Sequence, residues 1–311
     1  MTTTGTTLVI GATGTTGSRT AARLTVAGHR VRAASRHATR IAGAEPVAFD
    51  WYEPATHAAA LDGADRVYLV PPPGDFDPAA VMLPFLRRAR AAGVRRAVLL
   101  SSSAIPEGGP AVGAVHQALP GLFAEWAVLR PSWFMQNVTG AHAHALSIRE
   151  EGVIRTATGA GRVGFVDAED IAAVAVRALT DQRAPNADLV LTGPEALSYD
   201  DVAAIMTEAT GRLVVHRRLS YEQLRDRLTG LIPIRFATML AAMDQAIAEG
   251  SEERLTDTVQ RLTGRPPGAF RALLGREMRC GGGDGFGATG GSGPSPERPQ
   301  GALGRPPSAH L

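Results

Sequence analysis

A glycine-rich segment near the N-terminus carries residue types that can bind phosphate. It reads Gly11-Ala-Thr-Gly14-Thr-Thr-Gly17, after an apolar stretch and at the start of a helical one. Glycine lets a backbone turn tightly and approach a pyrophosphate closely, and the amides and dipole of a helix N-terminus attract the anion. We therefore predict that the three glycines, with Thr13, Thr15 and Thr16, bind a dinucleotide. A merely structural tight turn is the alternative.

The residues that end the next predicted strand bear on the choice of dinucleotide. An Asp or Glu about 20 residues beyond the glycines would bind the ribose hydroxyls of NAD, but here the chain reads Val31-Arg-Ala-Ala-Ser35-Arg36. Arg36 can form a charge-assisted pair with the 2′-phosphate of NADP, and Ser35 can add a hydrogen bond. NADP(H) is therefore the preferred cofactor and NAD(H) the second choice. In the alternative interpretation Arg36 is a solvated loop residue.

Further candidate cofactor contacts follow the later strands, because the carboxyl ends of parallel strands share the edge at which such folds bind ligands. Asp50 and Trp51 are placed to flank the adenine, although Asp50 could instead cap the next helix. Pro71-Pro72-Pro73 cannot continue a strand and forms a rigid loop at this edge. The predicted cofactor contacts at these later strand ends are Asp50, Trp51, Val70, Pro71, Pro72, Ser101, Ser102 and Pro131.

An aromatic segment after the sixth predicted strand could form the wall of an acceptor site. Residues 131–137 read Pro-Ser-Trp-Phe-Met-Gln-Asn, and aromatic side chains would stack on a flat acceptor. The predicted substrate contacts are Pro73, Trp133, Phe134, Met135 and Asn137. Core packing between two lobes is the alternative.

The chain lacks the Tyr-x-x-x-Lys pair with which many dehydrogenases protonate a substrate oxygen. All 32 cationic residues are arginine, and the helical stretch 111–123 has no tyrosine. His116 occupies roughly the place of that tyrosine and can donate a proton near neutral pH. Its alternatives are a partly buried helix residue or a part of the substrate wall. Because hydride transfer needs mostly placement, an easily reduced acceptor such as a quinone, flavin or iminium suits this site better than a simple ketone.

The residue types that are missing exclude several other sites. Without lysine the chain has neither a P-loop nor a Schiff-base enzyme's nucleophile. The single cysteine, Cys280, excludes an intrachain disulfide and a cysteine-cluster metal site. His142 and His144 are expected two residues apart on one helix and so on different faces, and Asp167 is interpreted as a helix N-cap. No metal site is expected.

The overall charge and hydropathy argue against nucleic acid or a membrane as partner. The net charge is +2 at pH 7, and the arginines are scattered. We find no run of 18 apolar residues and no signal peptide. We expect a soluble, cytoplasmic protein that acts on a small-molecule acceptor, with a regulatory protein as partner if the chain is a sensor.

Strands and helices alternate over the first 135 residues. Strands are expected at 7–11, 30–35, 46–50, 66–70, 95–101 and 126–130, and helices at 16–27, 56–61, 78–92 and 111–123. Continuous apolar runs suit strands covered on both faces, so the pattern predicts an α/β fold with a Rossmann-like, doubly wound parallel sheet. Beyond it we expect helices at 138–150, 168–179 and 199–210, the last capped by Ser198, and strands at 152–157, 188–192 and 213–218.

Three parts follow from this pattern. Residues 1–135 are predicted to form the NAD(P)-binding domain, and residues 136–280 a smaller α+β substrate lobe of the same extended fold. Residues 281–311 contain 10 Gly and 5 Pro, a composition that predicts a disordered tail. We also raise the hypothesis that this tail is translated from a shifted reading frame.

The segments Gly11–Gly17, Asp50-Trp51, 67–73 and 129–137 resemble the NmrA-like atypical short-chain dehydrogenase/reductases, over roughly residues 6–270. The bacterial branch similar to ergot-alkaloid-biosynthesis reductases and NADPH quinone reductases is the nearest in pattern. The resemblance implies an NAD(P)-binding fold with a small substrate lobe. It leaves two functions open: an NADPH-dependent oxidoreductase, or a non-catalytic NADP(H) sensor that regulates a partner protein.

Overall fold

The computed structural model describes residues 5–280, and its first half alternates strands and helices as the sequence predicts. The predicted tail, 281–311, lies outside the described residues. In chain order the elements are β1 (Thr6–Ile10), α1 (Thr15–Val26), β2 (Arg30–Ser35), β3 (Glu45–Ala48), η1 (Pro54–Thr56), α2 (His57–Leu61), β4 (Ala64–Leu69), α3 (Ala79–Ala91), β5 (Arg96–Leu100), α4 (Gly113–Leu122) and β6 (Glu125–Pro131).

These strands form one parallel sheet in the order β3-β2-β1-β4-β5-β6-β9. The strand order reverses direction beside β1, since β2 and β3 lie on one side of it and β4 to β6 on the other. In such sheets ligands bind outside the carboxyl ends of the strands at the point of reversal. The predicted α/β, doubly wound fold is confirmed.

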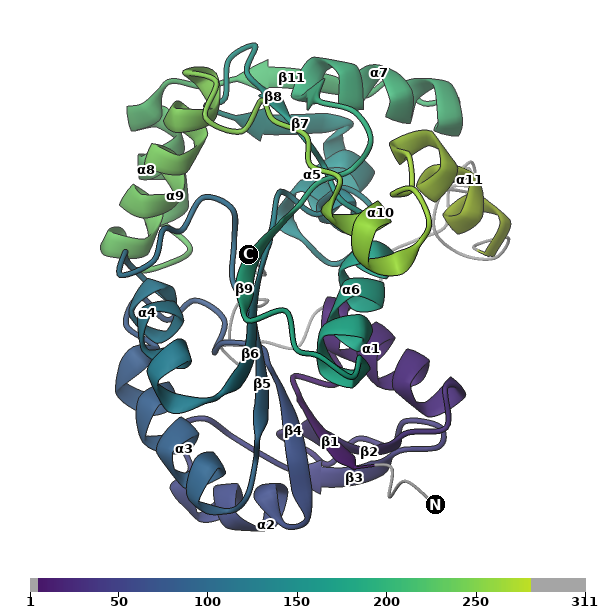
Figure 1. Ribbon diagram of the computed structural model, residues 1–311. Coiled ribbons are helices and arrows are strands. Elements are labelled where there is room, and N and C mark those ends of the chain that lie inside the picture. Colours follow the sequence, from purple (N-terminus) through teal and green to yellow (C-terminus); the bar gives the residue numbers. More distant parts are fainter. Residues whose placement is uncertain (1–4, 281–311) are drawn as a thin grey trace, which may run out of the picture.

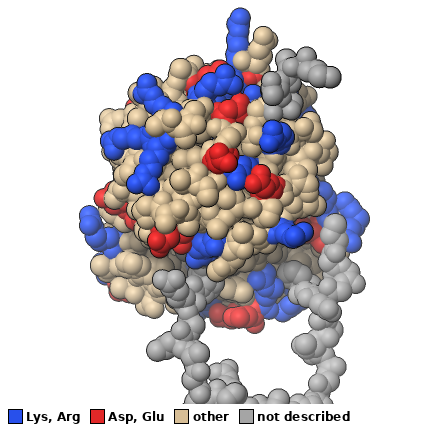
Figure 2. Space-filling view, turned by 90° about the horizontal axis from the view of Figure 1, so that it is seen from below, with Lys and Arg blue, Asp and Glu red and all other residues tan. Residues whose placement is uncertain are grey.

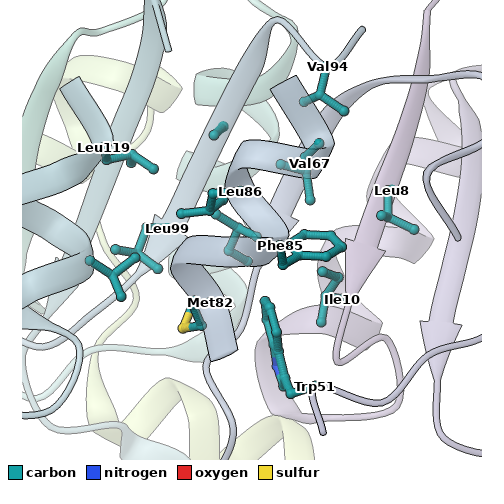
Figure 3. Close-up of a cluster of buried hydrophobic side chains, with 14 of the residues drawn as sticks. Leu8, Ile10, Trp51, Val67, Met82, Phe85, Leu86, Val94, Leu99 and Leu119 are labelled. Atoms are coloured by element: carbon teal, nitrogen blue, oxygen red, sulfur yellow. The ribbon is translucent and has the colours of Figure 1, made fainter. Parts of the chain in front are cut away.

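Helices cover both faces of the sheet because neighbouring strand residues point to opposite sides. Leu8 and Ile10 of β1 pack with Phe85 and Leu86 of α3 in one apolar cluster, whereas Val9 belongs to the cluster on the other face. Accordingly α3 and α4 lie on one side of the sheet and α1 and α6 on the other (Figure 1). Figure 3 shows the first of these clusters, with Phe85 above Ile10 and Trp51.

The second half of the chain returns to the main sheet before it completes the smaller lobe. Its elements are η2 (Met135–Asn137), α5 (Ala143–Glu151), β7 (Val153–Thr156), β8 (Arg162–Val163), α6 (Ala168–Thr180), β9 (Ala187–Leu191), β10 (Leu197–Ser198), α7 (Tyr199–Thr210), β11 (Val215–Arg218), α8 (Tyr221–Thr229), α9 (Ile234–Ala248), α10 (Thr258–Thr263) and α11 (Phe270–Cys280). Strand β9 pairs with β6, and α6 packs against α1. The main sheet therefore extends past the division at residue 135.

The smaller lobe has its own apolar core and its own short strands. Phe165, Tyr199, Met206 and Phe270 are among its buried residues. Strand β11 pairs in parallel with β7, and β10 pairs antiparallel with β8. Helices α8 and α9 pack side by side at the flank of this lobe (Figure 1).

Local signals explain where two of these helices begin. Ser198 accepts a hydrogen bond from the Asp201 amide, and the Asp201 carboxylate accepts one from the Ser198 amide, so the predicted N-cap of α7 is confirmed as a capping box. The helix expected at 138–150 starts later, at Ala143, because residues 137–140 form turns closed by the Phe134, Met135 and Gln136 carbonyls. His142 caps it.

The charged residues of the surface are mixed in sign. On the face seen in Figure 2, Arg side chains alternate with Asp and Glu. Within residues 5–280, no helix is both long and apolar enough to cross a membrane.

Candidate active site

The glycine loop between β1 and α1 makes close contacts that leave no room for a side chain at two of its three glycines. Gly11 has φ +71°, and a Cβ there would lie 2.9 Å from the Cβ of Val70. A Cβ on Gly17 would lie 2.1 Å from the Gly11 carbonyl oxygen. Gly14 differs, because that same oxygen, at 3.3 Å, is the sole described atom within 4 Å of its added Cβ. A contact of 3.3 Å with a backbone oxygen is still tight, so the loop is closed at Gly11 and Gly17 and is open at Gly14 only on the side away from the Gly11 carbonyl.

The open side of this loop fits a phosphate. Gly14 is the N-cap of α1 and makes no side-chain cap hydrogen bond, and the first turn has no acidic residue. The first amides of a helix lack partners within it, and they attract anions. Thr13, exposed, and Thr15 and Thr16 lie at this end of α1. The residues present thus fit the pyrophosphate of a dinucleotide.

Ser35 and Arg36 lie at the carboxyl end of β2, at the same edge of the sheet. The Ser35 hydroxyl oxygen accepts a hydrogen bond from the Thr39 amide at 3.0 Å, which shapes the turn that follows. Arg36 is exposed, and within residues 5–280 its guanidinium has no ion-pair or side-chain hydrogen-bond partner. Its donors are therefore available to a ligand phosphate.

Asp50 and Trp51 follow β3 but do different things. One Asp50 carboxylate oxygen accepts a hydrogen bond from the Tyr52 amide at 2.9 Å, and the nearby η1 has Glu53 as its N-cap, so Asp50 does not cap a helix. The Trp51 indole N–H donates to the Val70 carbonyl at 3.1 Å. The Trp51 ring is buried and meets Phe85 edge-on at 5.2 Å (Figure 3). Trp51 thus anchors the segment after β3 to the end of β4.

Ser101 and Ser102 follow β5 and face a cavity. The Ser101 hydroxyl oxygen is buried and has no hydrogen-bond partner among the described residues. Such an orphaned polar group marks a place where a ligand or water is needed. The Ser102 hydroxyl accepts a hydrogen bond from the Ala104 amide at 3.3 Å. The Ser101 hydroxyl therefore fits a polar group of a ligand at this edge.

The cavity has a volume of about 280 Å³ and lies between the carboxyl ends of β5 and β6 and the helices α5, α8 and α9. Its lining is mostly apolar. Six residues predicted as cofactor or substrate contacts line it together: Ser101, Ser102, Pro131, Trp133, Phe134 and Asn137.

Three residues predicted as substrate contacts or as catalytic lie elsewhere, and the predicted cofactor contacts Val70, Pro71 and Pro72, in the loop after β4, are not part of the lining either. Met135 is 1% exposed and packs in the core of the smaller lobe. Pro73 is exposed in the loop after β4 and is not part of the cavity lining, in contrast to Pro131. His116 is the third.

His116 lies on α4 with its ring buried. Its Nδ1 atom has no hydrogen-bond partner within the described part of the chain. Burial lowers the pKa of the imidazole, so it is neutral at pH 7. The ring is not part of the cavity lining.

The segment 131–137, which we predict to form the acceptor wall, is held in place by the main sheet and by the start of α6. Phe134 bridges to Val166, and the Met135 amide donates to the Val166 carbonyl at 3.0 Å. The Gln136 side chain donates to Asp167 at 2.8 Å, and Asp167 caps α6, which confirms the predicted N-cap. The wall is therefore fixed by elements that the sheet itself positions.

The two histidines near the cavity correct our expectation that they point apart. His142 lies outside α5 as its N-cap, its Nδ1 accepts a hydrogen bond from the His144 amide at 3.1 Å, and the two rings are 4.7 Å apart. Both line the cavity. Burial holds the pKa of His144 well below its usual value, so its ring is neutral.

Asp244 is a cavity residue that sequence reasoning did not find. It lies on α9 together with Phe236, Leu240 and Met243, which also line the cavity. Positions 236, 240, 243 and 244 share one face of a helix. A single carboxylate on an otherwise apolar helix face is the signal that could have identified it.

Comparison with known proteins agrees with this geometry. Residues 11–182 match a family described as NAD(P)H-binding, and residues 125–262 match the NmrA-like family. An uncharacterised oxidoreductase of Bacillus subtilis, YesF, is 48% identical over 84% of this chain and 91% of its own length. Festuclavine synthase II of Penicillium roqueforti is 38% identical over 87% of this chain and 97% of its own.

A solved structure shares the fold. The NADPH-dependent quinone oxidoreductase QOR2 of Escherichia coli, complexed with NADPH, aligns with a TM-score of 0.72 at 24% identity, over 88% of this chain and 99% of that one. With full-length relatives well above 30% identity, the chain belongs to the NmrA-like, NAD(P)H-binding oxidoreductases.

Proposed function

We propose that this protein uses NADPH to reduce a small, flat, electron-poor acceptor of the quinone, flavin or imine/iminium type. The observation that carries this proposal is the cavity at the carboxyl edge of β5 and β6. Ser101, Ser102 and Pro131 bound it on the side of the expected cofactor, and Trp133 and Phe134 form an aromatic wall. When bound, the nicotinamide supplies a hydride.

Each part of the chain has a defined task in this proposal. The open side of the glycine loop holds the pyrophosphate, and Arg36, with Ser35, holds the 2′-phosphate that distinguishes NADP from NAD. The Ser101 hydroxyl donates its free hydrogen bond to the cofactor or acceptor. The apolar lining excludes water from the acceptor.

The nature of the acceptor follows from the missing proton donor. Helix α4 contains no tyrosine and the chain no lysine. Acceptors that require little proton transfer suit such a site. His116 is the one donor that the sequence offered, and a general acid contributes about 10²–10⁴-fold. Because its neutral ring lies outside the cavity lining, we expect His116→Asn to reduce turnover of a quinone less than about threefold.

The test is steady-state oxidation of NADPH or NADH, followed by loss of reduced nicotinamide absorbance, with a panel of quinones, flavins and cyclic iminium compounds. Gly14→Asp, which places a carboxylate beside the open phosphate site, is the control. We expect turnover with NADPH that this variant loses. Tight NADPH binding without turnover of any acceptor would contradict the proposal and favour a non-catalytic sensor that regulates a partner protein.

A further inference from the structure

Asp244 brings a carboxylate into a cavity whose other lining residues are apolar, neutral polar or basic. Among the described residues that line the cavity, it is the single carboxylate. It lies in the C-terminal half of α9, one turn beyond Leu240 and next to Met243. Nothing in the apolar pattern of this helix face requires an acid there.

The Asp244 carboxylate is held in place but poorly compensated. One oxygen, Oδ2, accepts a hydrogen bond from the Ala157 amide at 2.8 Å. Within residues 5–280 neither oxygen forms an ion pair or a second hydrogen bond. Burial in these surroundings raises the pKa of Asp244 to about 6. An ionised carboxylate in an apolar site is costly unless a cation pairs with it.

The cationic and titratable groups nearby leave Asp244 unpaired. From β7, Arg155 is bound to Glu151 and to the Ser147 hydroxyl of α5. Arg227 of α8 is exposed. From the side of α5 come His142 and the neutral His144. The negative charge of Asp244 contributes to raising the pKa of the Tyr199 phenol of α7, but this side chain is buried in the core of the smaller lobe.

We infer that Asp244 is a specificity-determining residue that pairs with a positive charge on the acceptor. This inference rests on the proposed function and selects, among its acceptor classes, a flat cation such as a cyclic iminium. A cationic nitrogen would supply the partner that the carboxylate lacks, whereas a neutral quinone would have to meet an uncompensated negative charge. The apolar and aromatic lining would contact the flat body of the same molecule.

The first test is binding, which requires no turnover and no reductase activity. N-Methylquinolinium and the neutral 1-naphthol, two bicyclic aromatics of similar size, are titrated by calorimetry at about pH 8, with and without saturating NADP⁺. Asp244→Asn keeps the shape and an acceptor for the Ala157 amide. Asp226→Asn removes a carboxylate on α8 that is exposed and paired with Arg225, outside the cavity.

We expect the wild type to bind the cation about tenfold or more tightly than naphthol. The affinity of Asp244→Asn should be about 10–100-fold lower than that of the wild type for the cation, and less than about twofold lower for naphthol. Asp226→Asn should behave as wild type. Equal affinity of wild type and Asp244→Asn for the cation, or no binding of the cation by the wild type, would overturn the inference. If no acceptor were turned over in the NADPH oxidation assay, the proposed function would fail, but this binding result would still hold.

The pH dependence separates cation binding from proton donation. If the ionised carboxylate binds the cation, the affinity of the wild type must fall as pH is lowered through about 6, and Asp244→Asn must show no such fall. If Asp244 were instead a proton donor, the variant would keep its affinity for the cation and lose turnover of neutral quinones. That outcome would contradict the inference. Far-UV circular dichroism and urea unfolding confirm that the variants are folded.

Discussion

The Gly11 carbonyl oxygen lies 2.1 Å from the position that a Cβ would take on Gly17. The first turn of α1 thus packs directly on the loop that precedes it. Beside Gly14 the nearest described atom, the same oxygen, is 3.3 Å from an added Cβ. Gly17 therefore lets the helix approach the loop, whereas Gly14 leaves space for a ligand on the side away from the Gly11 carbonyl.

Gly17→Ala should destabilise the protein even without cofactor, because its methyl group has no room beside the Gly11 carbonyl. Overpacking of this kind costs about 1–3 kcal/mol, more than the gain in helix propensity of about 1 kcal/mol. Urea unfolding of the cofactor-free protein measures the change. Gly14→Asp is the contrast: its Cβ would lie 3.3 Å from the Gly11 carbonyl oxygen, so it should lower the free energy of unfolding less than Gly17→Ala does and lose dinucleotide binding. Equal stability of Gly17→Ala and wild type would contradict the close contact.

Arg36→Ala should weaken the binding of NADPH and leave the binding of NADH unchanged, because the 2′-phosphate is the one group that distinguishes the two cofactors. A charge-assisted contact contributes about 1.5–3 kcal/mol, so the KM for NADPH should rise about 10–100-fold. Steady-state kinetics with both cofactors measures this. Arg30→Ala is the matched control, since Arg30 is an exposed arginine at the opposite end of the same strand, β2. An Arg36→Ala protein that keeps its full preference for NADPH would refute the assignment.

Ser103→Ala should lower stability, whereas Ser101→Ala should not. The Ser103 hydroxyl donates to the Glu252 carboxylate at 2.6 Å, and both are buried, so its loss leaves Glu252 short of a donor. A buried acceptor without its partner costs about 1–3 kcal/mol. The Ser101 hydroxyl has no described partner to lose. Urea unfolding compares the two, and titration with NADPH should show the reverse order, with Ser101→Ala the weaker binder.

Much of this fold could be predicted because its signals are local. The strand at Arg30–Ser35 and the helix at Tyr199–Thr210 have the predicted bounds, and the serine cap that starts the helix acts within a few residues. Strands β8 and β10, of two residues each, were missed because so short a segment has no periodicity.

The cavity could be predicted in part. Pro131, Trp133 and Phe134 follow a strand, and the rule that strand ends share an edge brings them to the site. Asp244 is conspicuous locally as one carboxylate on an apolar helix face, but its place in this cavity depends on the packing of α8 and α9 over that edge, a long-range contact that no local pattern encodes. For the same reason the sequence did not predict that β9 joins the main sheet, because its pairing with β6 connects segments about 60 residues apart.

The stability of the protein should depend on pH through Asp244. Its folded-state pKa of about 6 lies above the ordinary value of 3.8, so the native protein holds this proton more tightly than the unfolded chain does. That contribution to stability is fully present below about pH 4 and is lost as pH rises through about 6. Asp244→Asn mimics the protonated form. Its free energy of unfolding should equal that of the wild type near pH 4 and be higher above about pH 7, by up to about 3 kcal/mol. Urea unfolding of both proteins across this range measures the difference, with the exposed Asp226→Asn as a control. A difference that stays constant with pH would show that water already compensates the Asp244 carboxylate, and the cavity would then have no unpaired charge for a cation to meet.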